Sequence, residues 1–202
     1  MDPRFVSYDI DLTGESPASN THHNIVTPEN LMSTPSRFVT EVQQVALVVR
    51  DIDKALEEYT RLLGIGPWWV SVYGPPKLTG MRIRGKTIPY SMKLALAWTG
   101  TTMWELIQPL EGPSIYKEFL NDHGEGLHHP LVEHEGVDFE DAIARFTEKG
   151  CPPLMEGSIG EIRFAYVESE GPLKTTIELV HRPADFVRPE PDYWYPAPPA
   201  ER

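Results

Sequence analysis

Four polar side chains stand at matching places in two similar halves of the chain. Gln44 and His129 each stand at the start of an apolar, strand-like stretch, and Glu105 and Glu178 each lie in a later one. One amide oxygen, one imidazole and two carboxylates suit a borderline-to-hard divalent ion such as Zn²⁺, Co²⁺, Ni²⁺ or Mn²⁺. The sequence therefore supplies the donors for one divalent metal ion, with coordination positions left for water or substrate oxygens.

Each glutamate also has a simpler interpretation. A glutamate in an apolar strand such as Met103–Ile107 commonly faces solvent, because an unpaired buried carboxylate is unstable. Glu105 and Glu178, however, occur in matching Glu-Leu-Ile and Glu-Leu-Val contexts near the ends of the two halves. That recurrence favours an inward, paired role for both carboxylates. Gln44 by itself does not indicate a metal site.

The elements that must position these donors follow one order twice. Val42–Val49 predicts a buried strand, and the next segment predicts a helix that begins at Asp51 and ends at Gly64. Residues 74–86, rich in Gly, Pro, Lys and Arg, predict a loop. The other predicted elements are strands at Trp68–Tyr73, Met92–Trp98 and Met103–Gln108, a helix at Ser114–Asp122, a strand at His129–Glu133, a helix at Phe139–Lys149, and strands at Leu154–Glu156, Ile162–Val167 and Thr175–Val180.

This repetition predicts an α+β fold of two tandem βαβββ modules that form a curved mixed sheet around one metal site. We assign the first module to 41–110, a linker helix to 111–127 and the second module to 128–183. Residues 1–40 lack any sustained period and predict an irregular arm. Residues 184–202, rich in Pro and aromatic side chains, predict an extended tail that docks on a surface.

Several of these segments resemble methylmalonyl-CoA epimerases and glyoxalase I relatives of the vicinal oxygen chelate superfamily. The resembling segments are Gln44-Val45-Ala46-Leu47-Val48-Val49, Trp104-Glu105-Leu106-Ile107-Gln108-Pro109 and Gly124-Glu125-Gly126-Leu127-His128-His129. The resemblance implies that His129 is a metal ligand, with Glu105 and Glu178 as the carboxylate ligands. Many relatives have His where this chain has Gln44, and Gln there is similar to some glyoxalase I enzymes.

The resemblance also implies a type of chemistry. In this superfamily a metal binds adjacent oxygens of the substrate and stabilises an enolate or oxyanion while a base moves a proton. We expect an isomerase, epimerase or lyase acting on a small carbonyl compound, with Glu178 as both ligand and base. Tyr90, His123 and His128 are further catalytic candidates. Each has a plainer role, as a strand-end aromatic, a helix cap or a packing residue. The chain lacks the usual second glutamate base of the epimerases, since Pro89 or Tyr90 takes its place.

Aromatic side chains are the candidates for a substrate pocket. Trp68, Trp69, Tyr73, Trp98 and Trp104 are predicted to line it, although strand aromatics are more often plain core. A compact aromatic or apolar substrate fits such walls better than a long anionic one. Lys77, Arg82, Arg84 and Lys86 cluster in the 74–86 loop, and a solvated loop is the simpler interpretation of them.

Composition restricts the partners. The formal charge of −12 argues against nucleic acid and anionic membranes, and the single cysteine, Cys151, fits a reducing cytoplasm. By resemblance, we expect a homodimer.

Two alternative functions stay open: a non-catalytic binding module like the bleomycin-resistance relatives, and an Fe(II) extradiol-type dioxygenase. Gln44 and the additional carboxylate disfavour the dioxygenase, which uses two histidines and one carboxylate.

Overall fold

The computed structural model describes residues 38–200, which belong to one compact unit, Arg37–Arg202. The predicted N-terminal arm, 1–40, lies outside the described residues apart from its last three positions. Phe38 precedes the first strand, which already begins at Val39. Among the described residues, the helices are too short or too polar to cross a membrane.

The predicted helices and strands occur along the chain in the predicted order. The helices are α1 (Ile52–Leu63), α2 (Ile115–Asp122), α3 (Phe139–Glu148) and α4 (Glu170–Leu173). The strands are β1 (Val39–Val48), β2 (Trp68–Tyr73), β3 (Leu78–Ile83), β4 (Lys86–Thr87), β5 (Met92–Thr99), β6 (Thr102–Pro109), β7 (Gly126–His134), β8 (Pro153–Ile159), β9 (Ile162–Val167), β10 (Ile177–His181) and β11 (Tyr193–Tyr195).

The two halves have the same topology. In the first half β1 pairs parallel with β6, which pairs antiparallel with β5, and β5 with β2. In the second half β7 pairs parallel with β10, which pairs antiparallel with β9, and β9 with β8. The first and last strands of each half are therefore neighbours, as the duplication requires. The predicted α+β fold class is confirmed.

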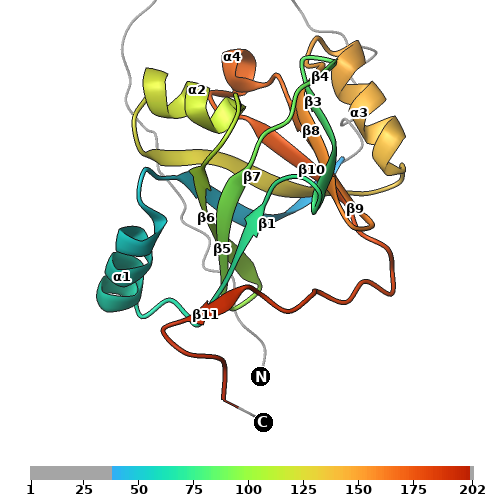
Figure 1. Ribbon diagram of the computed structural model, residues 1–202. Helices are drawn as coiled ribbons and strands as arrows, with labels where there is room; N and C mark the ends of the chain where they lie inside the picture. The colour runs from blue at the N-terminus through green and yellow to red at the C-terminus, as the bar shows by residue number, and fades with distance from the viewer. Residues whose placement is uncertain (1–37, 201–202) are drawn as a thin grey trace, which may run out of the picture. The chain divides into compact units, whose positions relative to one another are not determined.

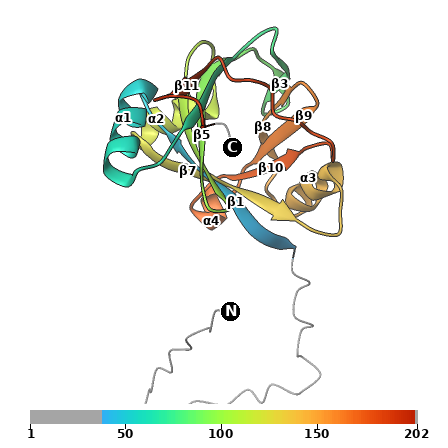
Figure 2. The same cartoon turned by 90° about the horizontal axis from the view of Figure 1, so that it is seen from below.

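The halves join along their first strands. β1 and β7 pair antiparallel, which makes one mixed sheet ordered β11-β2-β5-β6-β1-β7-β10-β9-β8-β3-β4. Figures 1 and 2 show this sheet curving around its inner face, with α1 and α3 on the outer side. The antiparallel junction brings β6, β1, β7 and β10 side by side at the centre of the sheet.

Strand alternation separates the inner face from the outer face. Ala46 and Val48 of β1 pack in the inner cluster, whereas Leu47 of β1 and the next residue after the strand, Val49, pack with Ile52 of α1 on the outside. A third cluster joins Ala142 of α3 to the outer face of the second half. Because successive side chains point to opposite faces, the side chains between outward-facing residues point into the concavity.

Helices α1 and α3 begin at the capping residues that their sequences indicate. The carboxylate of Asp51 caps α1 by accepting a hydrogen bond from the backbone of Lys54, and Asp138 caps α3 through Asp141 in the same way. Gly64 ends α1 with a left-handed φ of 68°.

Two features differ from the sequence-based expectations. Part of the predicted 74–86 loop is the hairpin β3–β4, whose turn places Arg84 and Gly85 at positive φ. Strand β3 pairs with β8 of the other half, which buries Leu78 and Ile83. In the predicted C-terminal tail, β11 pairs antiparallel with β2, so the tail extends the opposite end of the sheet.

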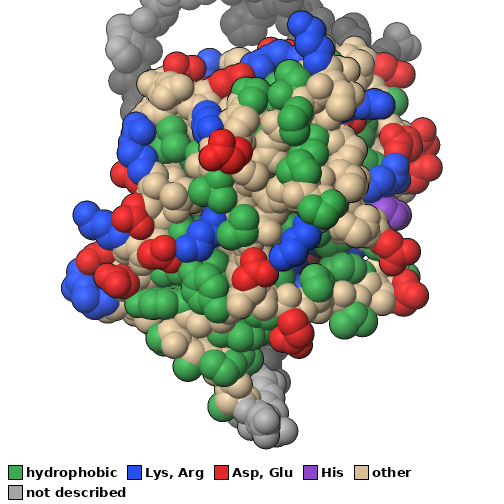
Figure 3. All heavy atoms as spheres, viewed as in Figure 1, with side chains coloured by type: hydrophobic (Ala, Val, Ile, Leu, Met, Phe, Trp, Pro, Cys, Tyr) green, Lys and Arg blue, Asp and Glu red, His purple; other side chains and the backbone are tan. Residues whose placement is uncertain are grey.

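Surface charge is mixed on the face shown in Figure 3. Lys and Arg side chains are interspersed there with Asp and Glu and with hydrophobic groups. This face of the described residues therefore presents no continuous basic patch.

We expect Gly112→Ala to destabilise the fold by about 2 to 3 kcal/mol. Gly112 has a φ of 73°, and an added Cβ would lie 2.2 Å from the carbonyl oxygen of Pro89. Gly124→Ala is the matched control, because its φ is 82° but nothing lies within 4 Å of its Cβ position. Urea denaturation of both variants separates the steric clash from the backbone strain. Equal losses in the two variants would contradict the close approach at Gly112.

Candidate metal centre

Four adjacent strands each contribute one polar side chain to the inner face of the sheet. Glu105 on β6 and His129 on β7 both lie opposite Ala46 of β1, and Gln44 and Glu178 both lie opposite Leu131 of β7. The pairing therefore places the four donors in two neighbouring rows, and all four side chains are buried.

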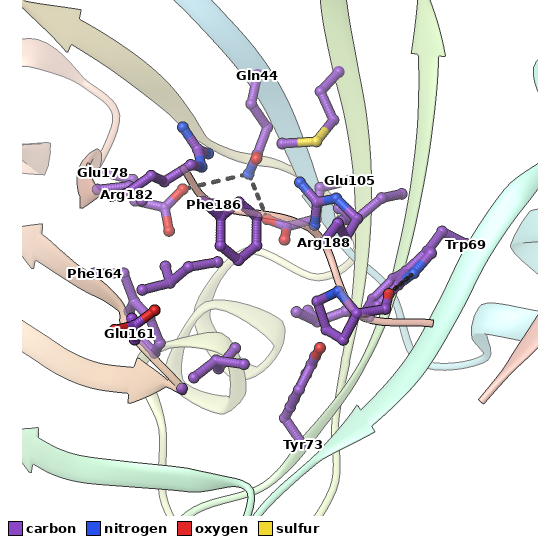
Figure 4. A pocket seen from close by; sticks show the side chains of 18 of the residues that line it. Gln44, Trp69, Tyr73, Glu105, Glu161, Phe164, Glu178, Arg182, Phe186 and Arg188 are labelled. Carbon is purple, nitrogen blue, oxygen red and sulfur yellow. Dashed lines mark hydrogen bonds between the residues drawn. The ribbon is translucent and has the colours of Figure 1, made fainter. Parts of the chain in front are cut away.

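The side chains of this group converge closely. Ligand atoms of Glu105, His129 and Glu178 all lie within 4.8 Å of one another. His129 Nε2 lies 3.4 Å from Glu105 Oε2 and 3.3 Å from Glu178 Oε2. Gln44 Nε2 donates to Glu105 Oε2 at 2.6 Å and to Glu178 Oε2 at 3.3 Å, as Figure 4 shows.

The chemistry of this group fits a divalent metal ion. His129 Nε2 is fully buried and has no hydrogen-bond partner among the described residues, although it lies between two carboxylates. A buried polar atom without a partner is costly, and a cation between the three groups would satisfy the imidazole and both carboxylates together. An imidazole with two carboxylates is a donor set that Zn²⁺, Co²⁺, Ni²⁺ and Mn²⁺ accept.

Burial and mutual charge shift the pKa values in this group. Burial raises the pKa of Glu105, and the carboxylate of Glu178 adds to that increase against the opposing effect of His129. Burial alone would lower the pKa of His129, but the two carboxylates outweigh it and raise the pKa to about 9. Without a metal ion, a proton on His129 therefore provides the positive charge between Glu105 and Glu178.

His128 orients the imidazole of His129. The two Nδ1 atoms lie 2.7 Å apart, so one nitrogen donates and the other accepts. Burial, and then the neighbouring His129, lowers the pKa of His128 to about 2. A neutral His128 accepts the Nδ1 proton of His129 and thereby directs Nε2 of His129 toward Glu105 and Glu178.

Gln44 differs from the other three donors in its orientation. Its amide nitrogen, not its oxygen, faces the carboxylates. A metal ion accepts the oxygen of an amide, so ligation by Gln44 would require the amide to turn over. In the orientation seen here, Gln44 holds the two carboxylates in place by donating to both.

The group forms one wall of a cavity of about 520 Å³ on the inner face of the sheet. Gln44, Glu105 and Glu178 reach this cavity, and apolar side chains line much of the rest. Figure 4 shows Trp69 and Tyr73 on one side and Phe164 on another. The volume lies within the range of sites for small molecules.

Comparison with known proteins identifies the family. The model of the Glyoxalase/Bleomycin resistance protein/Dioxygenase superfamily matches residues 43–166, more than half of the chain. The chain belongs to this superfamily. The match includes Gln44, Glu105 and His129, whereas Glu178 lies beyond it. The resemblance to the vicinal oxygen chelate superfamily is thus confirmed.

Solved structures with a similar chain trace include methylmalonyl-CoA epimerases. The enzyme from Mycobacterium tuberculosis is 20% identical with a TM-score of 0.49, over 75% of this chain and 93% of that one. A Streptomyces coelicolor methylmalonyl-CoA epimerase variant, in complex with 2-nitronate-propionyl-CoA, is 19% identical with a TM-score of 0.48. The match covers 75% of this chain and 99% of the epimerase chain. No curated protein matches the chain.

Only some of the predicted pocket aromatics line the cavity of this superfamily member. Trp69 and Tyr73 do so. The structure corrects the placement of Trp68 and Trp104, which lie on the outer face of the sheet near Tyr59 of α1. Trp68 and Trp69 are consecutive in β2, so the two side chains must point to opposite faces. Trp98 is 44% exposed and lies beside Arg188 outside the cavity lining.

Two catalytic candidates lie away from the cavity of the glyoxalase-like domain. Tyr90 is buried in the core, where its hydroxyl donates to the carbonyl of Glu156, and burial raises its pKa. His123 caps α2 on the surface, 3.0 Å from Glu170. Neither residue lines the cavity, so the structure corrects both assignments. His128 contacts the group only through His129.

The cavity also includes side chains that sequence reasoning missed. Tyr116 and Tyr166 line it, with their hydroxyls 2.7 Å apart. Arg182, Phe186 and Arg188 line it from the C-terminal segment. The prolines and aromatics of that segment predicted docking, but no local signal showed that it would cross this cavity.

Proposed function

We propose that the chain is a divalent-metal-dependent isomerase, epimerase or lyase that acts next to the carbonyl group of a small substrate. Glu105, His129 and Glu178 would hold the metal ion. The observation that carries the proposal is the buried Nε2 of His129, which faces two carboxylates and has no hydrogen-bond partner among the described residues. A binding module without a metal gains nothing from burying two carboxylates together.

The protein side chains divide the chemistry between them. A bound divalent ion supplies Lewis-acid stabilisation of an enolate or oxyanion. Glu178 removes the proton from the carbon next to the carbonyl and returns it, because its carboxylate both joins the buried group and reaches the cavity. Gln44 donates to both carboxylates and thereby holds them in position.

The paired tyrosines add a hydrogen-bond donor. Tyr116 and Tyr166 share one hydrogen bond between their hydroxyls, so one hydroxyl proton of the pair is free for another acceptor. Burial raises the pKa of both phenols, which keeps them protonated at neutral pH. We propose that this free proton stabilises negative charge on a substrate oxygen.

The absence of a second buried carboxylate base makes methylmalonyl-CoA a poor candidate substrate. Where the epimerases have this glutamate, the chain has Pro89 or Tyr90, and the hydroxyl of Tyr90 is already bound to Glu156. Beyond Glu105 and Glu178, the cavity's carboxylates are Glu161 and Asp185, both exposed. Glu178 must then serve both directions of proton transfer.

Solvent deuterium exchange tests this proposal. Wild type loaded with Zn²⁺, Co²⁺, Ni²⁺ or Mn²⁺ should exchange the proton next to the carbonyl of aromatic 2-hydroxy ketones or aldehydes in D₂O, followed by NMR. Reloaded Glu178→Gln should lose at least about 100-fold of the rate. Tyr166→Phe should lose about tenfold or more while it keeps its metal content. Failure of every loaded form to exchange any compound of the panel would refute the proposed activity.

A further inference from the structure

The C-terminal segment crosses the cavity between two fixed ends. It leaves β10 after His181 and ends in β11, which is paired with β2 (Figure 1). Trp69 Nε1 donates to the carbonyl of Pro189 at 3.0 Å, and the carboxylate of Asp192 accepts from the backbone of Val72 at 2.8 Å. These contacts hold the intervening residues over the cavity.

Two arginines of this segment face the cavity without a carboxylate partner. Arg188 packs its guanidinium against Trp69, Trp98 and Phe186, with centroid distances of 5.6, 5.3 and 6.0 Å. Arg188 forms no ion pair or hydrogen bond with any described residue. Arg182 donates only to the amide oxygen of Gln43, at 3.0 Å. Figure 4 shows both arginines beside the Glu105 and Glu178 group.

A bound anion would supply a counter-charge to both half-buried arginines. Burial, and then the charge of Arg182, lowers the pKa of Arg188, and the opposing effects of Tyr73 and Glu105 do not offset this decrease. Glu161 and Asp185 also line the cavity but are exposed, and neither forms an ion pair with Arg182 or Arg188 in the described part of the chain. A guanidinium in this position presents a planar fork of donors that matches an oxyanion.

The charge of the metal centre supports the same conclusion. A divalent cation with Glu105 and Glu178 has a formal charge of zero, and the whole chain carries −12. Neither attracts an anionic group into the cavity. Arg182 and Arg188 supply the positive charge on its wall.

We infer that Arg188, assisted by Arg182, binds an oxyanion of the substrate, a carboxylate or a phosphate group, while the carbonyl end faces Glu105 and Glu178. This inference rests on the proposed function, which places the reacting carbonyl at that group. Trp69, Tyr73 and Phe164 form the apolar walls between the two ends. The substrate class is therefore a compact aromatic or apolar carbonyl compound that carries one oxyanion.

Binding of three related probes tests this inference. Phenylacetate, phenyl phosphate and the neutral phenylacetamide are titrated by calorimetry into metal-loaded and metal-free full-length protein. Wild type should prefer at least one of the two anions over phenylacetamide by about tenfold or more. The preferred anion identifies the oxyanion. Arg188→Gln should remove that preference and leave phenylacetamide binding unchanged, and Arg188→Lys should retain part of it because the charge remains.

The control is Arg61→Gln, which replaces an exposed arginine of α1 that pairs with Glu58. It should bind all three probes as wild type does. Equal binding of the anions and phenylacetamide by wild type, or an anion preference that survives in Arg188→Gln, would overturn the inference. Metal content of every protein is measured in parallel. A wild type that prefers anions but holds no metal would refute the proposed function and leave the oxyanion site standing.

Discussion

His129→Ala is expected to lower the affinity for Zn²⁺ by at least about 100-fold. Substitution of a residue that only hydrogen-bonds to a metal ligand costs up to about 100-fold, and loss of the ligand itself should cost at least as much. His129 supplies the single nitrogen donor of the group, and its Nε2 lies 3.4 and 3.3 Å from the two carboxylates. Competition with a chromogenic chelator measures this affinity.

The same substitution should destabilise the metal-free protein by about 3 to 5 kcal/mol. Glu105 and Glu178 would remain buried together without the positive charge that His129 provides. His134→Ala is the matched control, because His134 lies on the same strand, stacks on Phe38 and stands outside the group. Unchanged Zn²⁺ affinity in His129→Ala, or an equal loss in His134→Ala, would contradict the assigned ligand.

The metal-free protein is expected to lose stability as the pH rises from about 6.5 to about 9. In the folded protein the pKa of His129 is about 9, above the ordinary histidine value of 6.5. A raised pKa means that the folded state holds the proton more tightly. The resulting stability is complete below pH 6.5 and is lost as the pH passes through 9. The expected loss is on the order of 3 kcal/mol. The raised pKa of Glu105 acts in the same direction.

Metal binding should reverse this pH dependence. A ligating imidazole is deprotonated, so Zn²⁺ competes with protons and binds more tightly as the pH rises. Urea denaturation at pH 6 to 9.5, with and without Zn²⁺, measures both effects, and the stability gained from Zn²⁺ should increase with pH. A metal-free protein that is equally stable at pH 6.5 and 9 would show that His129 does not carry the buried charge.

The duplication made the centre of the fold predictable. The repeated βαβββ order predicted one curved mixed sheet around a single site, and the sheet places β6, β1, β7 and β10, which carry the four donors, side by side. Glu105 and Glu178 stood in matching contexts in sequence and converge in the structure. Local periodicity and internal symmetry were sufficient for this part, because each strand pairs with a partner that the repeat itself defines.

The alternation of side chains along a strand would have corrected part of the prediction of the pocket aromatics. Trp104 directly precedes Glu105, so an inward Glu105 requires an outward Trp104. For Trp68 and Trp69, alternation shows that only one can face the cavity but not which one. The answer depends on α1, whose residues Ile52 and Leu56 cover the outer face where Trp68 lies.

Non-local pairing explains what the sequence left open. Strand β3 pairs with β8 of the other half, and this pairing buries Leu78 and Ile83. In the sequence these two residues stand among Gly, Lys and Arg, so the segment shows no clear strand pattern. The path of the C-terminal segment depends on contacts such as that of Trp69 with Pro189, 120 positions apart. No local pattern predicts such a pairing, so Arg188 could not be assigned to the cavity from sequence.

Metal content tests the central claim most directly. Elemental analysis of purified wild type beside Glu178→Ala, both after dialysis against the four candidate metals, measures whether the buried group holds an ion. The proposed centre predicts about one divalent ion per chain in wild type and its loss in Glu178→Ala. A wild type that retains no Zn²⁺, Co²⁺, Ni²⁺ or Mn²⁺ would contradict the metal centre and favour an aromatic-walled binding module.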